Sequence, residues 1–160
     1  GFKPTFPNVT FDEQLESRDG NIRLVIKQTG GHTDCSTYIF CPDYRTIATG
    51  DNLWTKYYPW GGARGSDPDV WIQTLEECLS LDAKYFIPGH GPVGGKDDVT
   101  RMLNYLTNVR DIMKGTITDG KSAEEVTRAG GEVKYYPSGA GHPHISTLKK
   151  WYKISRTRVS

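Results

Sequence analysis

The sequence predicts a single α/β (α+β) domain, and three observations support this. The 160 residues, 17.9 kDa, fit one domain, because domains usually contain about 100–200 residues. Short β-rich segments fill the first half of the chain, and helical periodicity dominates the second half. The 18 glycines and 9 prolines predict many tight turns, which argues against a helical bundle, a coiled coil and a disordered chain. We therefore treat residues 1–160 as one domain.

Five strands are expected, at residues 10–17, 22–28, 37–40, 46–49 and 85–87. Asp19-Gly20 is a turn signal, so the first two strands should form a hairpin. Pro42-Asp43 should join the third and fourth strands in a second hairpin. The fifth strand is a short apolar run that is expected to end at Pro88-Gly89, because proline cannot donate to a strand ladder.

Four helices are expected, at residues 68–81, from about 97 to beyond 113, at 121–128 and at 145–154. Asp67 should cap the first helix, and Pro68 suits its first turn. Asp97 and Asp98 favour the start of the long second helix, because carboxylates stabilise the amino end of a helix dipole.

Composition and charge argue against some classes of protein and bear on the kind of ligand. No segment approaches the roughly 20 apolar residues of a membrane span, and no signal segment opens the chain. Three cysteines without CxxC spacing argue against a disulfide framework and favour a reducing, cytoplasmic location. The net charge is only +1, but six basic residues and no acid follow Glu132. This basic tail would suit an anionic ligand or nucleic acid, and equally the solvated face of a terminal helix.

Metal-capable side chains follow three of the expected strands. The segments are Gly30-Gly31-His32-Thr33-Asp34, Ala48-Thr49-Gly50-Asp51-Asn52 and Ile87-Pro88-Gly89-His90-Gly91-Pro92. Each segment places an imidazole or a carboxylate beside glycines, which let the backbone turn sharply and crowd a site. His32, Asp51 and His90 therefore form a plausible zinc-ligand set.

The ordered series Gly31-His32-Thr33, Thr49-Gly50-Asp51 and Pro88-Gly89-His90-Gly91 resembles the later metal motifs of the metallo-β-lactamase superfamily. The resemblance covers roughly residues 11–106. It implies that His32 binds the first metal, that Asp51 bridges both metals and that His90 binds the second. An aspartate at the bridging position is similar to the glyoxalase II and lactonase-like branches. The implied activity is hydrolysis of an ester, thioester or amide in a small-molecule substrate, with two zinc ions, or iron or manganese in their place.

The sequence departs from the family in lacking the earlier His-x-His-x-Asp-His motif. The remaining histidines, His142 and His144, could supply two ligands from one extended segment. The alternative is that this chain is the carboxyl-terminal half of a longer protein, which the initial Gly1 also suggests. In that case the isolated chain is expected to be inactive or nearly so.

The resemblance also implies the architecture, which would be half of a four-layer αββα sandwich. A mixed, largely antiparallel sheet would carry helices on one face and leave its other face apolar. This apolar face should be covered, either by the missing amino-terminal half or by a second copy of the chain in a homodimer.

Further residues are candidates for substrate binding. Trp54 and Tyr57, with the neighbouring Tyr58 and Trp60, would wall a pocket or else pack on the core. Lys149 and Lys150 would bind a substrate carboxylate, as basic residues near the carboxyl terminus of glyoxalase II-like enzymes do.

Two residues that follow His32 have alternative roles. Asp34 and Cys35 lie close to His32 in sequence and would approach the metal, or serve only as a turn acid and a buried small residue. The alternative to a hydrolase is that the whole chain is a non-catalytic binding module, which would hold nucleic acid through its basic tail. Its low net charge and the few aromatics among the cations argue against nucleic acid.

Overall fold

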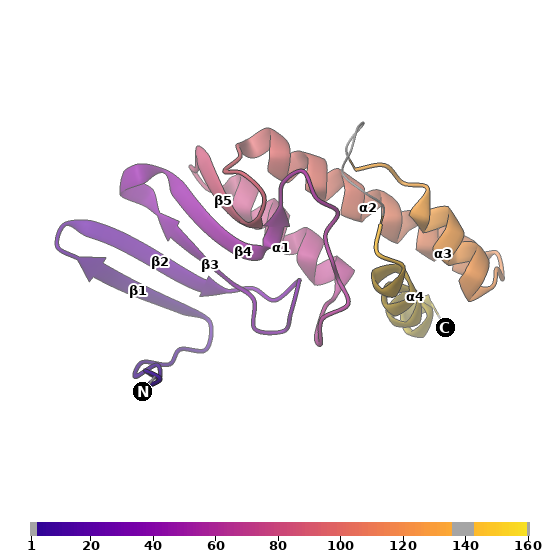
Figure 1. Ribbon diagram of the computed structural model, residues 1–160, viewed down its shortest axis with the longest axis horizontal. Helices are drawn as coiled ribbons and strands as arrows, with labels where there is room; N and C mark the ends of the chain where they lie inside the picture. The colour runs from indigo at the N-terminus through magenta and orange to yellow at the C-terminus, as the bar shows by residue number, and fades with distance from the viewer. Residues whose placement is uncertain (1–2, 136–142, 160) are drawn as a thin grey trace.

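The computed structural model describes residues 3–135 and 143–159. Within these residues five strands form one mixed sheet in the order β1-β2-β3-β4-β5 (Figure 1). The strands are β1 (Gln14–Asp19), β2 (Ile22–Gln28), β3 (Thr37–Cys41), β4 (Thr46–Trp54) and β5 (Tyr85–His90). The first four strands pair antiparallel in sequence order, and β5 pairs parallel with β4. The predicted hairpins are therefore confirmed.

The helices of the described chain are α1 (Pro68–Ser80), α2 (Lys96–Thr118), α3 (Ala123–Gly131) and α4 (Ile145–Val159), with a 3₁₀ turn, η1 (Pro42–Tyr44), between β3 and β4. The Asp67 side chain accepts hydrogen bonds from the backbone N–H groups of Asp69 and Val70, as the sequence predicts for the cap of α1. Helix α1 is the crossover between the parallel strands β4 and β5, and α2 follows β5. Helices α3 and α4 pack on α2, beyond the sheet (Figure 1).

Several strand ends differ from the prediction, and β1 spans Gln14–Asp19 instead of residues 10–17. Strand β5 does not stop at Pro88 but continues to His90. Proline is tolerated there because β5 is the last strand in the sheet order, where one side of the backbone needs no strand partner. Strand β4 extends beyond Thr49 to Trp54, with register shifts at Gly50. The segments around Asp51 and His90 therefore lie largely in irregular extensions of β4 and β5, whereas the segment around His32 is a loop.

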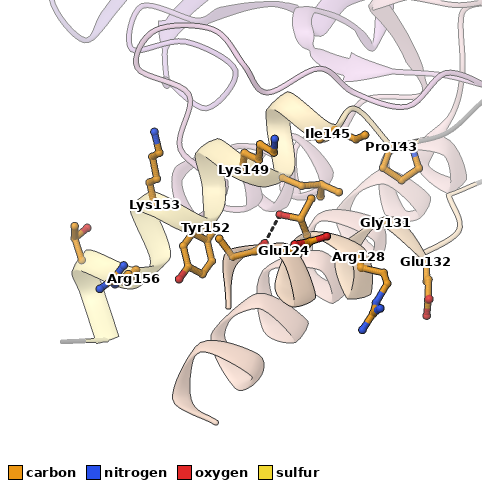
Figure 2. Close-up of a pocket in the computed structure, with 14 residues that line it drawn as sticks. Glu124, Arg128, Gly131, Glu132, Pro143, Ile145, Lys149, Tyr152, Lys153 and Arg156 are labelled. Carbon is orange, nitrogen blue, oxygen red and sulfur yellow. Dashed lines mark hydrogen bonds between the residues drawn. The ribbon is translucent and has the colours of Figure 1, made fainter. Parts of the chain in front are cut away.

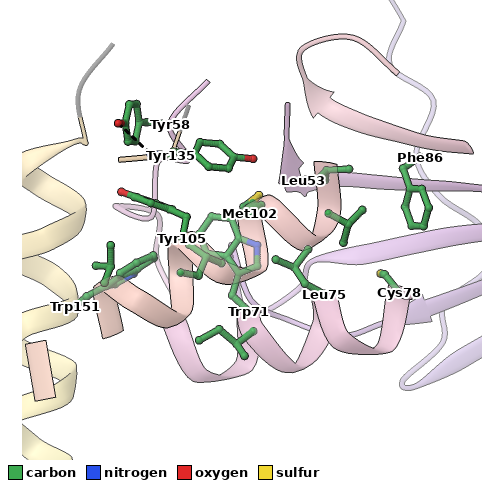
Figure 3. Packing of buried hydrophobic residues seen from close by; sticks show 14 of the residues in the cluster. Leu53, Tyr58, Trp71, Leu75, Cys78, Phe86, Met102, Tyr105, Tyr135 and Trp151 are labelled. Atoms are coloured by element: carbon green, nitrogen blue, oxygen red, sulfur yellow. Dashed lines mark hydrogen bonds between the residues drawn. The ribbon is translucent and has the colours of Figure 1, made fainter. Parts of the chain in front are cut away.

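Side chains from one face of the sheet and from the helices form the hydrophobic core (Figure 3). Phe86 and Ile47 point into it from neighbouring strands and are fully buried. Trp71 from α1 and Met102 from α2 meet them, and Trp151 of α4 closes the far end of the cluster (Figure 3). The helices therefore cover this face of the sheet.

The opposite face carries a row of apolar residues that no helix of the described chain covers. The strand register aligns Leu15, Ile26, Ile39, Ala48 and Ile87 across all five strands. Ile39 and Ile87 are 41% and 43% exposed. The predicted mixed sheet with helices on one face and an apolar opposite face is thus confirmed. No helix in the described ranges is both long enough and apolar enough to cross a membrane.

Candidate metal centre

The structure brings His32, Asp51 and His90 together. Asp51 Oδ2 lies 3.9 Å from His32 Nδ1, and Asp51 Oδ1 lies 3.5 Å from His90 Nε2. Each carboxylate oxygen thus faces a different imidazole. Both separations exceed the length of a hydrogen bond, so the three groups face one another without bonding directly.

His32 is positioned by a buried asparagine. The backbone N–H of His32 donates to Asn52 Oδ1 at 2.9 Å, and Asn52 Nδ2 donates to the carbonyl of Gly30 at 3.0 Å. Gly31 has a φ of +103°, and a Cβ there would lie 2.9 Å from Asn52 Oδ1 and 3.0 Å from the backbone of Trp71. Only glycine lets this loop turn so close to α1.

Asp51 and His90 are held by neighbouring strands. A Cβ on Gly89 would overlap Asp51 Oδ1, so the absence of a side chain there makes room for the carboxylate. The indole of Trp54 stacks on the His90 ring with the centroids 3.7 Å apart, and its Nε1 donates to the Asp51 carbonyl. The backbone of Thr55 donates to the His90 carbonyl. These contacts orient the exposed imidazole of His90.

The two imidazoles have different surroundings. His32 is only 6% exposed, and its Nε2 is a buried nitrogen without a hydrogen-bond partner in the described part of the chain. Burial lowers the pKa of His32, and the opposing charge of Asp51 does not fully offset this. His32 is therefore neutral at physiological pH, which is the form that binds a metal.

The donor set fits part of a zinc site. A carboxylate between two imidazoles, one of them with an unpartnered buried nitrogen, has the chemistry that zinc prefers. Among residues 3–135 and 143–159, no three His, Cys, Asp or Glu side chains are close enough together to hold one ion. The described residues therefore offer the donor types of a zinc site but do not by themselves enclose an ion.

The predicted aromatic wall divides into two groups. Trp54 stacks on His90, and the Trp60 ring lies 6.2 Å from the ring of His32, so both border the metal centre. Tyr57 is 55% exposed in the same loop. Tyr58 instead packs in the core against Tyr105 and Tyr135, as the alternative for these aromatics anticipated.

Lys149 and Lys150 point in different directions. Lys150 is half-buried, donates to the carbonyl of Ala63 and is one of the charges that lower the pKa of His32. Lys149 is exposed and lines a groove between α3 and α4. The described structure therefore places Lys150, but not Lys149, on the side of α4 that contacts the loop beside the metal centre.

The other candidate ligands that the structure describes are exposed. Asp34 and Cys35 are both exposed, and Cys35 Sγ lies 3.5 Å from Thr33 Oγ1. His144 is exposed immediately before α4, and His142 lies outside the described residues.

Sequence reasoning missed the residues that support the site. Asn52 is fully buried, and only its position beside Asp51 hinted at a role. Helix α4 holds the loop that carries Trp60, because Ser146 Oγ accepts from the Trp60 indole and Thr147 Oγ1 accepts from the Gly61 N–H. These contacts join residues about 86 positions apart, which no local pattern reveals.

A family model described as the metallo-beta-lactamase superfamily matches residues 1–90. A stereoselective inverting sec-alkylsulfatase from Pseudomonas sp. superposes with a TM-score of 0.70 at 17% identity, over 93% of this chain and 26% of that one. A metallo-beta-lactamase family protein from Thermus thermophilus gives 0.66 at 15% identity, over 97% and 50%. A metallo-beta-lactamase from Pontibacter korlensis gives 0.58 at 23%, over 65% and 50%.

These similarities confirm the predicted fold class, and at such identities they concern the fold alone. The chain spans between about a quarter and a half of the length of these structures. No curated protein sequence matches it.

Proposed function

The chain belongs to the metallo-β-lactamase superfamily, and we propose that it supplies the carboxyl-terminal half of a zinc-dependent hydrolase. The observation that carries this proposal is the Asp51 carboxylate, whose two oxygens face the imidazoles of His32 and His90 separately. The substrate class is an ester, thioester or amide. An aspartate at this position supports the glyoxalase II or lactonase-like branch rather than the lactamases that use cysteine there.

Each of the three residues has its own role in this proposal. His32 Nε2 or Nδ1 and His90 Nε2 would each hold a zinc ion, and Asp51 would offer one oxygen to each ion. Iron or manganese could occupy the same donors. A bound ion would supply Lewis-acid polarisation of the scissile carbonyl and would lower the pKa of the attacking water.

The surrounding residues position these ligands and keep one of them neutral. Asn52 fixes the backbone of His32, and burial keeps the His32 imidazole neutral and ready to bind. Trp54 covers one face of His90 and limits the approach of water from that side. Trp54, Tyr57 and Lys150 are the residues we propose to contact a small-molecule substrate, and Lys149 faces elsewhere.

Three ligands cannot organise two ions, since a catalytic zinc ion usually has three protein ligands of its own. The isolated chain should therefore be nearly inactive, and activity should require ligands from the missing half of the fold. Its three cysteines are free, which agrees with a reducing compartment such as the cytoplasm.

The apolar face of the sheet offers a place for the missing half. The row through Ile39 and Ile87 lies on the side away from the helices and is partly exposed. The fold neighbours are about two to four times as long as the part that this chain covers, so the proposed occupant is the amino-terminal half of the sandwich. In its absence a second copy of the chain would bury the same face in a homodimer.

Titration of the protein with zinc, with the heat of binding measured by calorimetry, tests the metal proposal directly. Wild-type protein should bind zinc, and Asp51→Ala should weaken binding at least about tenfold, because metal-site ligands contribute strongly to affinity. His144→Ala is the matched control and should bind as the wild type does. Equal binding by wild type and Asp51→Ala would reject the site, and a loss in His144→Ala would assign a ligand role to His144.

Sedimentation velocity tests the proposal for the sheet face. The wild-type chain should self-associate at micromolar concentration, and Ile39→Lys combined with Ile87→Lys should be monomeric, because the two charges cannot be buried. Addition of the amino-terminal half should displace the homodimer. A wild-type chain that stays monomeric at all concentrations would contradict the homodimer.

A further inference from the structure

Trp60 is a large apolar side chain that stays exposed beside the candidate metal centre. It is 39% exposed, and the centroid of its ring lies 6.2 Å from that of the His32 imidazole. The ring of Trp54 lies 6.4 Å from the same imidazole and is half-buried. Two indole rings therefore border His32, and the ring of Trp60 is the more exposed of the two.

Contacts on its ring and on the neighbouring backbone fix the orientation of Trp60. The indole Nε1 donates to Ser146 Oγ at 3.2 Å. A Cβ on Gly62 would lie 2.7 Å from three atoms of the Trp60 ring, so the ring lies against backbone that carries no side chain. The backbone N–H of Gly61 donates to Thr147 Oγ1 at 2.8 Å, and this bond is buried. Because the ring is already held in place, a ligand that covers it loses little affinity to the ordering of this side chain.

One side of helix α4 contacts the loop of residues 60–67, which carries Trp60, along its length. The residues of α4 that form a hydrogen bond with this loop are Ser146, Thr147, Lys150, Trp151 and Arg158. Lys149 and Arg156 lie on a different side of the helix, along the groove toward α3 (Figure 2). The contacts of α4 with the loop are therefore separate from that groove.

The exposed indole of Trp60 offers a surface for an apolar part of a substrate. Sites for small molecules are lined mainly by apolar and aromatic side chains, with a few polar groups that fix orientation. A group that covers the ring removes apolar area from water on both partners, and a flat ring also allows stacking. Because Trp60 adjoins the proposed metal ligand His32, the group that it contacts would lie close to the scissile carbonyl.

We propose that Trp60 is a specificity-determining residue that contacts an apolar group of the substrate next to the scissile bond, and that Ser146 and Thr147 are the positioning residues that hold it there. This inference rests on the proposed function, because it needs a substrate bound at the metal centre. It narrows the substrate class to an ester, thioester or amide with an alkyl or aryl group beside the carbonyl.

Nuclear magnetic resonance on the metal-free 160-residue chain tests the positioning of Trp60. Nuclear Overhauser contacts between the ring protons of Trp60 and His32 should be present in the wild type. Ser146→Ala combined with Thr147→Val should lose them, because neither side chain then accepts a hydrogen bond from the loop. Ser146→Thr combined with Thr147→Ser retains both hydroxyls and should keep the contacts. Thr157→Val is the matched control, because the Thr157 hydroxyl donates within α4 itself.

Two hydroxamates test the selection of an apolar group. Acetohydroxamate and phenylacetohydroxamate bind zinc through the same group and differ by one phenyl ring. Calorimetry on the zinc-loaded chain should give about tenfold tighter binding of the phenyl compound, because only this compound covers the indole. Trp60→Ala should lose most of this preference, and so should Ser146→Ala combined with Thr147→Val. The affinity for acetohydroxamate should stay unchanged in both, whereas a general loss of structure would weaken both ligands.

Several results would overturn the proposal. An unchanged preference in Trp60→Ala would show that the indole does not contact the apolar group. Ring contacts and preference that both persist in the variant without the two hydroxyls would show that Ser146 and Thr147 do not position Trp60. A wild-type chain that binds no zinc would reject the proposed function and this role of Trp60 with it. Zinc binding without a preference for the phenyl compound would reject the role of Trp60 alone.

Discussion

The two faces of the β-sheet differ sharply, although they are built from alternate residues of the same strands. Phe86 and Ile87 are neighbours in β5, yet Phe86 is fully buried and Ile87 is 43% exposed. In β3, Phe40 is 9% exposed and Ile39 is 41% exposed. The helices cover one face, and nothing in the described chain covers the other.

This difference shows that β propensity does not decide burial. Isoleucine suits a strand interior whether or not another layer lies over it. The apolar row on the open face is of the kind that a sheet shows when it packs on a second sheet. The stability of this chain should therefore depend on one face, and its association with other chains should depend on the other.

The largest expected effect comes from the covered face. Phe86→Ala should lower the free energy of unfolding by about 3–5 kcal/mol, because it leaves a cavity beneath α1 and α2. Ile87→Ala, the matched change on the open face, should cost about 1 kcal/mol or less. Urea unfolding measures both values. Similar losses from the two variants would show that the faces are not energetically distinct.

A second effect concerns Asn52, which is fully buried and accepts a hydrogen bond from the backbone of His32 in the candidate metal centre. Asn52→Ala should cost about 1–3 kcal/mol, because it leaves the buried N–H of His32 and the carbonyl of Gly30 without their partners. It should also weaken zinc binding while the three proposed ligands remain intact. Asn104→Ala, on the exposed side of α2, provides the control for both measurements. Full zinc affinity in Asn52→Ala would show that the asparagine does not position His32.

A smaller effect should depend on pH. Burial alone would raise the pKa of Asp67, but hydrogen bonds and the charge of Arg158 bring that pKa below its ordinary value. The stabilisation is therefore present above the unfolded-state pKa of about 4 and is lost as pH falls through the folded-state value.

Arg158→Met should accordingly cost about 1 kcal/mol at pH 7, since Arg158 also pairs with Asp69 and the network is only partly exposed. The difference from wild type should shrink in acid, below about pH 4. Chemical unfolding across the pH range measures this difference. Lys153→Met on the same helix should show no such pH dependence, and a constant difference for Arg158→Met would contradict the assignment.

The smallest effect on stability is expected from the open face. Ile39→Lys should change the free energy of unfolding of the monomer by about 0.5 kcal/mol or less, because the side chain already contacts water. Thermal unfolding at low protein concentration checks this value. A loss of several kcal/mol would mean that Ile39 is already covered in the isolated chain.

Local sequence patterns predicted most of the fold. The turn at Asp19-Gly20, the Asp67 cap and the apolar positions of α2 specify elements through contacts between residues close in sequence. The end of β5 was predicted wrongly because Pro88 is unfavourable only where both sides of a strand are paired. Whether a strand lies at a sheet edge is a property of the whole sheet.

The metal-capable residues could also be found from the sequence, since glycines beside His32, Asp51 and His90 mark places where the backbone must approach closely. The convergence of these side chains around one carboxylate, and the buried Asn52 that supports it, required the structure. The different positions of the Lys149 and Lys150 side chains likewise depend on how α4 packs, because adjacent helix residues point about 100° apart.

The sequence by itself determined most of the elements and the candidate ligands, because these depend on residue type and short spacing, and the resemblance to a known family supplied the expectation of an apolar second sheet face. The tertiary structure alone decided which apolar face is covered, which lysine lies beside the candidate metal centre and where the α3–α4 groove lies. These features arise when segments distant in the chain pack together, and no local pattern contains that information.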